Sequence, residues 1–293
     1  METVRLLSGC KINLYLRILS RRADGFHDLA TLFHPLDEPH DVLTVSPGTP
    51  GSGFSFSCSR PDLENDSNIV AKTYRAFAAA TGFAPDLAVR LEKTVPSGAG
   101  LGGGSANAAR MLAFLNGSAR GAALDADALN ALAAGLGADV PFFLLNRPAW
   151  AEGIGERLAP LPPDREPLRG FSLVLVCPGV EVPTPWAFKA WDTLLERTGK
   201  IPGNRLTADV QAVKDLFCRK AVVLYNSFED VVFQAYPELR KVKETFFIQG
   251  ASGALLSGSG SSVFALFRDS GRAEEAARVF AGRGIHAFIR HPH

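Results

Sequence analysis

The sequence has little of what marks membrane, disulfide-stabilised or metal-cluster proteins. Only four of its 293 residues are cysteines, and they stand far apart, so we expect reduced thiols and neither a disulfide framework nor a cysteine metal site. No apolar run approaches the ~20 residues that cross a bilayer, and the N-terminal METVRLLSGC lacks a basic region followed by an apolar one. We therefore predict a cytoplasmic protein with no membrane partner. The cysteines are Cys10, Cys58, Cys177 and Cys218.

Charge of either sign is also not in excess. The 31 basic and 30 acidic side chains give a formal net charge of +1, and no segment concentrates the basic ones. Nucleic-acid binding is therefore disfavoured. With 46% hydrophobic and 21% charged residues, the composition is that of a folded globular protein. The chain is long for a single core, so we expect two domains.

Strand-like and helix-like segments alternate along the chain. Helical spacing begins at Asn68 and runs to about Thr81, and Gly82 is a suitable stop for it. Prolines and charges around 157–170 indicate a linker, where we place the domain boundary. The other expected strands are KINLYLRI, DVLTVSP, VRLEKTV, FSLVLVCPG, the two flanking the turn in ALLSGSGSSVFALF, and HAFIR. The other expected helices are the alanine-rich helix that follows the glycine-dense loop within PSGAGLGGGSANAARMLAFLN and that Asn116-Gly117 can end, DADALNALAAGLG, TPWAFKAWDTLLER, EEAARVFAG and NSFEDVVFQAYPELRKVKETFF, the last interrupted at Pro237.

The most informative segment is a glycine-rich loop between a strand and a helix. Residues 98–104, GAGLGGG, contain five glycines, and free N–H groups at the following helix start would attract phosphate oxygens. A flexible loop without ligand is the simpler alternative. Gly98, Gly100 and Gly103 also satisfy G-x-G-x-x-G, but the preceding VRLEKTV is half polar, unlike the buried strand of a dinucleotide-binding domain. A G-x-x-x-x-G-K-[ST] loop is absent, so a nucleoside triphosphate must be held in another way.

Three segments together resemble the GHMP kinases: CKINLYL, PSGAGLGGGSANAA and SGSGSSVF. RRADGFHDL, LGADVPFF, AEGIGE and PGVEVPTPWAF are similar to motifs of a member acting on a cytidine-diphosphate-linked methylerythritol, and they occur in the same order over nearly the whole chain. The resemblance implies an α+β, two-lobed GHMP kinase fold with the active site between the lobes. Residues 1–160 would form the ATP-binding lobe, similar to the second domain of ribosomal protein S5, and residues 161–293 a ferredoxin-like lobe. ATP and Mg²⁺ would be the co-substrates, and a hydroxyl of the small-molecule substrate would be phosphorylated in isoprenoid synthesis.

The resemblance also implies a catalytic pair. Asp139 matches the family's catalytic aspartate, which would orient or accept the hydroxyl proton, and Lys11 matches its partner. A lysine beside that carboxylate keeps it ionised and stabilises developing charge. The simpler alternatives are a turn or helix-cap aspartate and a solvated strand lysine.

Positions for nucleotide and substrate carry over in the same way. Ala106 stands where the family often has serine, which leaves the Mg²⁺ ligands unassigned. Phe26 replaces the usual tyrosine and keeps a face that could stack on a pyrimidine, with Phe188 on the other side of the ring. His27 could hydrogen-bond the edge of that pyrimidine. The simpler alternatives are a core phenylalanine and a loop histidine. The nucleotide positions are Asn68, Lys93, Pro96, Gly98, Ala99, Gly100, Leu101, Gly102, Gly103, Gly104, Ser105 and Asn107, and the substrate positions are Asn13, Phe26, His27, Thr184, Phe188, Gly258 and Gly260.

Two other functions are compatible with parts of this pattern. Mevalonate, homoserine or galactose kinases share the glycine motifs but give no reason for GFH together with TPWAF. A ribosome-associated or nucleic-acid-binding protein could share the N-terminal lobe, although fold alone does not establish function and the balanced charge argues against it. We expect a monomer or a homodimer.

Overall fold

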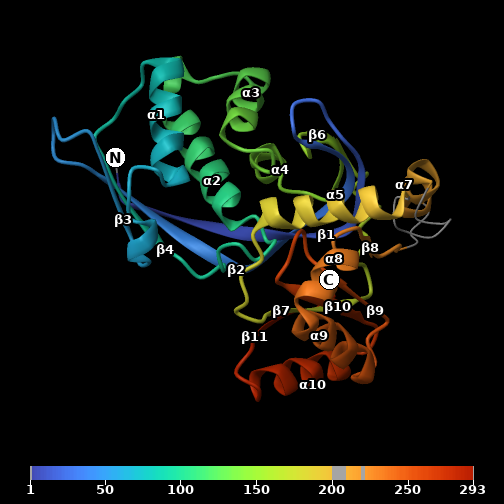
Figure 1. Ribbon diagram of the computed structural model, residues 1–293. Coiled ribbons are helices and arrows are strands. Elements are labelled where there is room, and N and C mark those ends of the chain that lie inside the picture. Colours follow the sequence, from blue (N-terminus) through green and yellow to red (C-terminus); the bar gives the residue numbers. More distant parts are fainter. Residues whose placement is uncertain (1, 200–208, 219–221, 293) are drawn as a thin grey trace. The chain divides into compact units, whose positions relative to one another are not determined.

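The computed structural model describes residues 2–199, 209–218 and 222–292, which form two compact units (Figure 1). Both units are assembled from separate stretches of the chain. The first contains residues 1–11, 35–95 and 102–147, and the second contains residues 12–34, 96–101 and 148–293. The expected boundary at residue 160 stays a prediction.

The first unit joins strands to a group of helices on one face of their sheet (Figure 1). Its strands follow the order β3-β4-β2-β1, with β3 parallel and β2 antiparallel to β4. In β4 the buried side chains of Leu87, Val89 and Leu91 alternate with partly or fully exposed residues, as its sequence predicts. The strands are β1 (Val4–Arg21), β2 (His27–Pro47), β3 (Phe54–Cys58) and β4 (Leu87–Glu92), of which β1 and β2 continue into the second unit.

Local signals set the ends of the helices in the first unit. The side chain of Asn68 accepts from the N–H of Val70, and Gly82 has a φ of 71°, so the predicted start and stop of the first helix are confirmed. The side chain of Asp125 caps a later helix by accepting from the N–H of Ala128. The helices are α1 (Ile69–Thr81), α2 (Gly103–Ser118), α3 (Ala126–Leu136) and α4 (Val140–Leu145).

The second unit contains an antiparallel sheet in the order β11-β7-β10-β9. With helices between β7 and β9 and between β10 and β11, this is the ferredoxin-like arrangement that the resemblance implied. Alternate residues such as Val174 and Val176 share a core with Trp191, Phe246 and Phe280 of the helices. The elements are β7 (Ser172–Cys177), α5 (Thr184–Thr198), α7 (Val210–Cys218), α8 (Glu229–Ala235), α9 (Pro237–Ile248), β9 (Gly253–Leu256), β10 (Val263–Phe267), α10 (Ser270–Ala281) and β11 (His286–Arg290).

Shorter strands complete the second unit. β5 (Ala149–Gly153) pairs with β2 and with β6 (Arg157–Pro160), and β8 (Tyr225–Asn226) pairs with β1. The predicted linker at 157–170 is therefore wrong for its first four residues, because their backbone is paired with β5. Cys10, Cys58 and Cys177 are buried, whereas the side chain of Cys218 lies outside the described residues. Among the described helices, none is long and apolar enough to cross a membrane.

Candidate active site

A buried lysine and a partly exposed aspartate form an ion pair in the first unit. The Nζ of Lys11 lies 3.9 Å from Oδ2 of Asp139, and the two side chains are 6% and 30% exposed. Burial lowers the pKa of Lys11, and the charge of Asp139 opposes that shift. Lys11 is thus not a solvated strand lysine. Asp139 directly precedes α4 but makes no side-chain cap hydrogen bond within the described chain, so its carboxylate is not used as a helix cap.

The last glycine before α2 packs against Lys11 of this pair. Gly102 has a φ of 69°, and a Cβ there would lie 2.9 Å from Cε2 of Phe143 and 3.3 Å from Cε of Lys11. Only glycine combines that backbone conformation with that approach. Gly102 is also the N-cap of α2 and supplies no side-chain acceptor for its first turn. The start of α2 therefore lies beside the side chain of Lys11.

The earlier part of the loop is held in the second unit by the glycine turn of SGSGSS. A Cβ on Gly100 would lie only 1.9 Å from the carbonyl oxygen of Ser257, and the hydroxyl of Ser257 donates to the carbonyl of Gly100 at 3.0 Å. The N–H of Ser262 donates to the carbonyl of Ala99 at 3.2 Å. The turn therefore supports the loop.

One amide that the sequence did not single out holds that turn in place. Asn226 donates from Nδ2 to the carbonyl oxygens of Leu256 and Gly258, each at 2.8 Å, while its Oδ1 accepts from the N–H of Phe228. Its side chain is buried. No sequence signal separated it from any other asparagine, because its partners lie about thirty residues away.

Three of the predicted nucleotide positions already have partners within the protein. The amide of Asn68 caps α1 and donates to the carbonyl of Leu63 at 2.9 Å. The ammonium of Lys93 lies 2.8 Å from Asp41. Asn107 also donates to Asp41, at 2.9 Å. The other nucleotide positions are in the loop or in the first turn of α2: Pro96, Gly98, Ala99, Leu101, Gly103, Gly104 and Ser105.

In the second unit the rings of His27 and Phe188 are stacked on each other. Their ring centroids are 4.5 Å apart at an interplanar angle of 19°. Nε2 of His27 lies 2.7 Å from the carboxylate of Asp192, which follows Phe188 by one helical turn on α5. Asp192 was missed from sequence, although its spacing from Phe188 places both on one helix face. Phe26 is 59% exposed, and a pyrimidine between Phe26 and Phe188 stays a prediction.

Three other predicted substrate positions, Asn13, Thr184 and Gly260, lie in or next to contacts within the protein. Asn13 is buried and donates to Thr31 at 2.8 Å. The hydroxyl of Thr184, the first residue of α5, lies 2.8 Å from that of Ser259, so it contacts the turn that contains Gly260. The structure thus brings together Lys11 with Asp139, His27 with Phe188, and Thr184 with the glycine turn.

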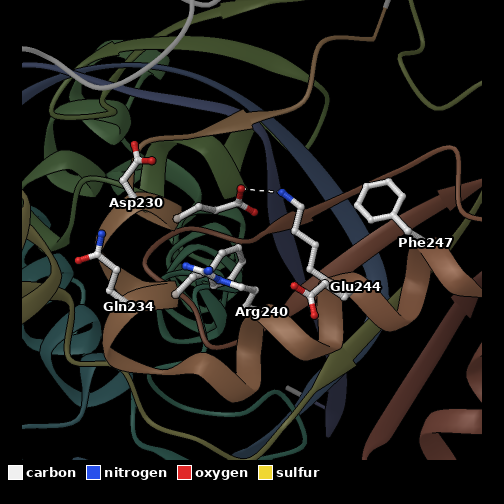
Figure 2. Close-up of a pocket in the computed structure, with 8 residues that line it drawn as sticks. Asp230, Gln234, Arg240, Glu244 and Phe247 are labelled. Carbon is white, nitrogen blue, oxygen red and sulfur yellow. Dashed lines mark hydrogen bonds and ion pairs between the residues drawn. The ribbon is translucent and has the colours of Figure 1, made fainter.

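A cavity of about 400 Å³ on α8 and α9 contains none of the predicted site residues (Figure 2). At its wall Lys243 forms a 2.6 Å ion pair with Glu229. Glu229 also accepts from the N–H of Leu256 at 3.0 Å, directly before the glycine turn. Burial raises the pKa of Glu229, and Lys243 opposes this rise. The pair thus fixes the strand that leads into the turn. The lining residues are Glu229, Asp230, Phe233, Gln234, Arg240, Lys243, Glu244 and Phe247.

Within residues 2–199, 209–218 and 222–292, no three His, Cys, Asp or Glu side chains are grouped as a metal site. Mg²⁺ commonly takes one or two carboxylates and completes its shell with phosphate oxygens and water. The carboxylate of Asp139 beside a phosphate-type loop is compatible with a metal that arrives with a nucleotide.

Comparison with known proteins agrees with this arrangement. The family descriptions "GHMP kinases N terminal domain" and "GHMP kinases C terminal" match residues 68–147 and 208–286. A 4-diphosphocytidyl-2-C-methyl-D-erythritol kinase from Solidesulfovibrio magneticus is 48% identical, covering 99% of this chain and 97% of the relative. A crystal structure of 4-(cytidine 5'-diphospho)-2C-methyl-D-erythritol kinase is 37% identical with a TM-score of 0.79, covering 98% of both chains.

More distant likeness defines the fold. A homoserine kinase from Cytophaga hutchinsonii superposes with a TM-score of 0.68 at 18% identity, covering 99% of this chain and 94% of that chain. The chain is a GHMP kinase by fold and by sequence. Within that class it belongs to the family of the 4-diphosphocytidyl-2-C-methyl-D-erythritol kinases.

Proposed function

We propose that this kinase transfers the γ-phosphoryl group of ATP to the 2-hydroxyl of 4-diphosphocytidyl-2-C-methyl-D-erythritol, a step of the non-mevalonate isoprenoid pathway. The observation that carries the proposal is the packing of Gly102 against Lys11, which itself pairs with Asp139. A hydroxyl-activating carboxylate, a buried cation and the phosphate-type helix start then occupy one place. The names of the similar proteins support the choice of substrate.

Each member of the pair has a separate task in this proposal. The carboxylate of Asp139 orients the acceptor hydroxyl and takes its proton as the oxygen attacks the γ-phosphorus. The buried ammonium of Lys11, which is paired with Asp139, stabilises negative charge on the transferring group. The N–H groups of the first turn of α2 bind phosphate oxygens. Asp139 would hold the Mg²⁺ that arrives with ATP, and the metal would neutralise further charge on the phosphates.

The nucleoside end of the substrate would be recognised in the second unit. The stacked His27 and Phe188 offer a face to a pyrimidine. The Asp192 carboxylate fixes the orientation of the imidazole, which can then bind the edge of the base. The cytoplasmic location, the absence of nucleic-acid and membrane partners, and the monomeric or homodimeric state stay predictions.

ADP release in the presence of ATP, Mg²⁺ and the cytidyl substrate tests the reaction, with mevalonate, homoserine and galactose as parallel acceptors. Turnover with the cytidyl compound alone is expected. Turnover with another alcohol would retain the phosphate loop but reject the cytidine surface. Silence with all four acceptors would reject the proposed reaction and favour the non-enzymatic alternative.

The variant Asp139→Asn tests the mechanism. It removes the proton acceptor and should lower kcat by roughly 10²–10⁴-fold with unchanged folding. Asp125→Asn is the matched control, because Asp125 is a helix cap in the same unit and asparagine caps equally well. Near-wild-type turnover of Asp139→Asn would remove Asp139 from the mechanism.

A further inference from the structure

The carboxylate of Asp41 on β2 lies at the centre of a buried cluster that joins both ends of the glycine loop. Its exposure is 0%. Oδ1 accepts from the backbone N–H groups of Thr94 and Val95 at 2.7 and 2.8 Å. Oδ2 accepts from Nζ of Lys93 at 2.8 Å and from Nδ2 of Asn107 at 2.9 Å. All four contacts are within the first unit.

These donors come from the two sides of the loop. Residues 93–95 lead into it, whereas Asn107 is on α2, which follows it. The two sides also touch each other, because a Cβ on Gly103 would lie 2.8 Å from Cγ1 of Val95 and 3.2 Å from Nζ of Lys93. Lys93 donates in addition to the carbonyl of Val95. The spacing between the loop's ends therefore depends on one carboxylate.

We infer that Asp41 is a positioning residue for nucleotide binding, which it controls by holding the two ends of the glycine loop at the separation that a triphosphate requires. The inference rests on the proposed function. Asp41 is buried and would not touch the nucleotide. Charged hydrogen bonds in a buried site are strong, and removing their acceptor leaves buried donors unpaired. A small change in loop spacing then weakens binding of ATP more than it changes the chemical step.

Asp41→Asn is the informative variant because it keeps shape but not charge. The retained oxygen can still accept from the two backbone N–H groups, while the new Nδ2 faces Nζ of Lys93 and Nδ2 of Asn107, and all three nitrogens are donors. The second change Asn107→Asp places a carboxylate opposite that amide and restores the charge of the cluster. The ammonium of Lys93 can then donate to the new carboxylate at position 107, because Lys93 and Asn107 donate to the same oxygen of Asp41 in the native protein.

Asp86→Asn is the matched control. Asp86 also accepts from two backbone N–H groups, those of Gly51 and Gly53, at 2.8 and 2.6 Å. It lies just before β4, at the opposite end of that strand from Lys93. It therefore reports the general cost of changing a carboxylate that holds backbone groups, without involving the glycine loop.

The experiment measures the Kd of a non-hydrolysable ATP analogue with Mg²⁺ by calorimetry, together with kcat, both KM values and the melting temperature. Asp41→Asn should raise the Kd of the analogue and the KM for ATP by about tenfold or more, while kcat and the KM for the acceptor change less than about threefold. The double variant should recover at least about threefold of the lost affinity. Asp86→Asn should bind the analogue like the wild type.

Unchanged nucleotide affinity in Asp41→Asn, or a double variant that recovers melting temperature but no affinity, would overturn the inference. If Asp41→Asn fails to fold, the variant Asn107→Ala is the deciding test, because it removes one donor and keeps the carboxylate of Asp41. This variant should weaken binding of the analogue about threefold. An unchanged Kd would overturn the inference. A wild type that binds the analogue but does not turn over the cytidyl substrate would reject the proposed reaction and leave this test intact.

Discussion

Replacing Gly100 by alanine should disrupt the phosphate loop through its contact with the SGSGSS turn. A Cβ there would lie 1.9 Å from the Ser257 carbonyl oxygen and 2.9 Å from its carbon. Because ordinary contacts between such atoms are about 3.5 Å, the loop and the turn must separate by more than ~1 Å. The residue also has a φ of 75°, which adds roughly 1–2 kcal/mol for any residue with a Cβ.

Loss of the hydrogen bond from Ser257 to the Gly100 carbonyl contributes about 1 kcal/mol more. We therefore expect the free energy of unfolding to fall by about 2–4 kcal/mol. Displacing the proposed phosphate-binding groups by about 1 Å should lower kcat/KM for ATP by about 10²-fold. Urea unfolding and an ADP-release assay measure the two effects on the same preparation.

Gly117→Ala is the control for this substitution. Gly117 lies in α2, and a Cβ there meets no atom within 4 Å, so alanine should stabilise the helix by roughly 0.5–1 kcal/mol without loss of activity. If Gly100→Ala keeps wild-type stability and kcat/KM while Gly117→Ala behaves as expected, the contact between loop and turn does not constrain the loop.

Two further predictions concern the stacked rings of His27 and Phe188 and a buried carboxylate. Phe188→Ala should weaken binding of cytidine diphosphate about tenfold, since it removes the stacking face. Replacing the half-exposed Phe247 by alanine should leave this Kd unchanged. An equal Kd in both variants would reject the pyrimidine site. Burial raises the pKa of Glu166, but the hydrogen bond and the charge of His34 outweigh this rise. The pKa of Glu166 is therefore lowered to about 2. A lowered carboxyl pKa stabilises the fold above pH 4.5, the ordinary value, and this contribution is lost as the pH falls toward 2. Glu166→Gln should therefore be about 1–2 kcal/mol less stable than the wild type at pH 6, after allowance for its partial exposure, and urea midpoints should converge below pH 4.5; a gap that is independent of pH would contradict this assignment.

Features determined by neighbouring residues could be predicted from the sequence. Asn68 and Gly82 mark the two ends of α1 because capping and left-handed termination depend on the local backbone alone. The alternation in VRLEKTV gave β4 for the same reason. The pairing of Lys11 with Asp139 was different: it followed from likeness to the GHMP kinases, since no local rule joins residues so far apart in the chain.

Partners of buried polar side chains could not be predicted. Asp41 begins the alternating segment DVLTVSP, where an aspartate is typical of an exposed strand end, yet its exposure is 0%. Its donors Lys93 and Asn107 are 52 and 66 residues away. Burial of such a carboxylate is tolerated only when hydrogen bonds replace its water, and this condition depends on tertiary contacts. The sequence shows which residues can donate and accept, but not that they contact one another in the fold.

The glycine loop shows the same division within a few residues. Glycine density predicted a phosphate loop, because close backbone approach requires the absence of side chains. Density alone could not tell which glycine faces what. Gly100 meets the Ser257 carbonyl in the second unit, whereas Gly102 meets Phe143 and Lys11 in the first. Each glycine is thus required by a different neighbour, so alanine at Gly102 should disturb the pair of Lys11 and Asp139, while alanine at Gly100 should act through the supporting turn.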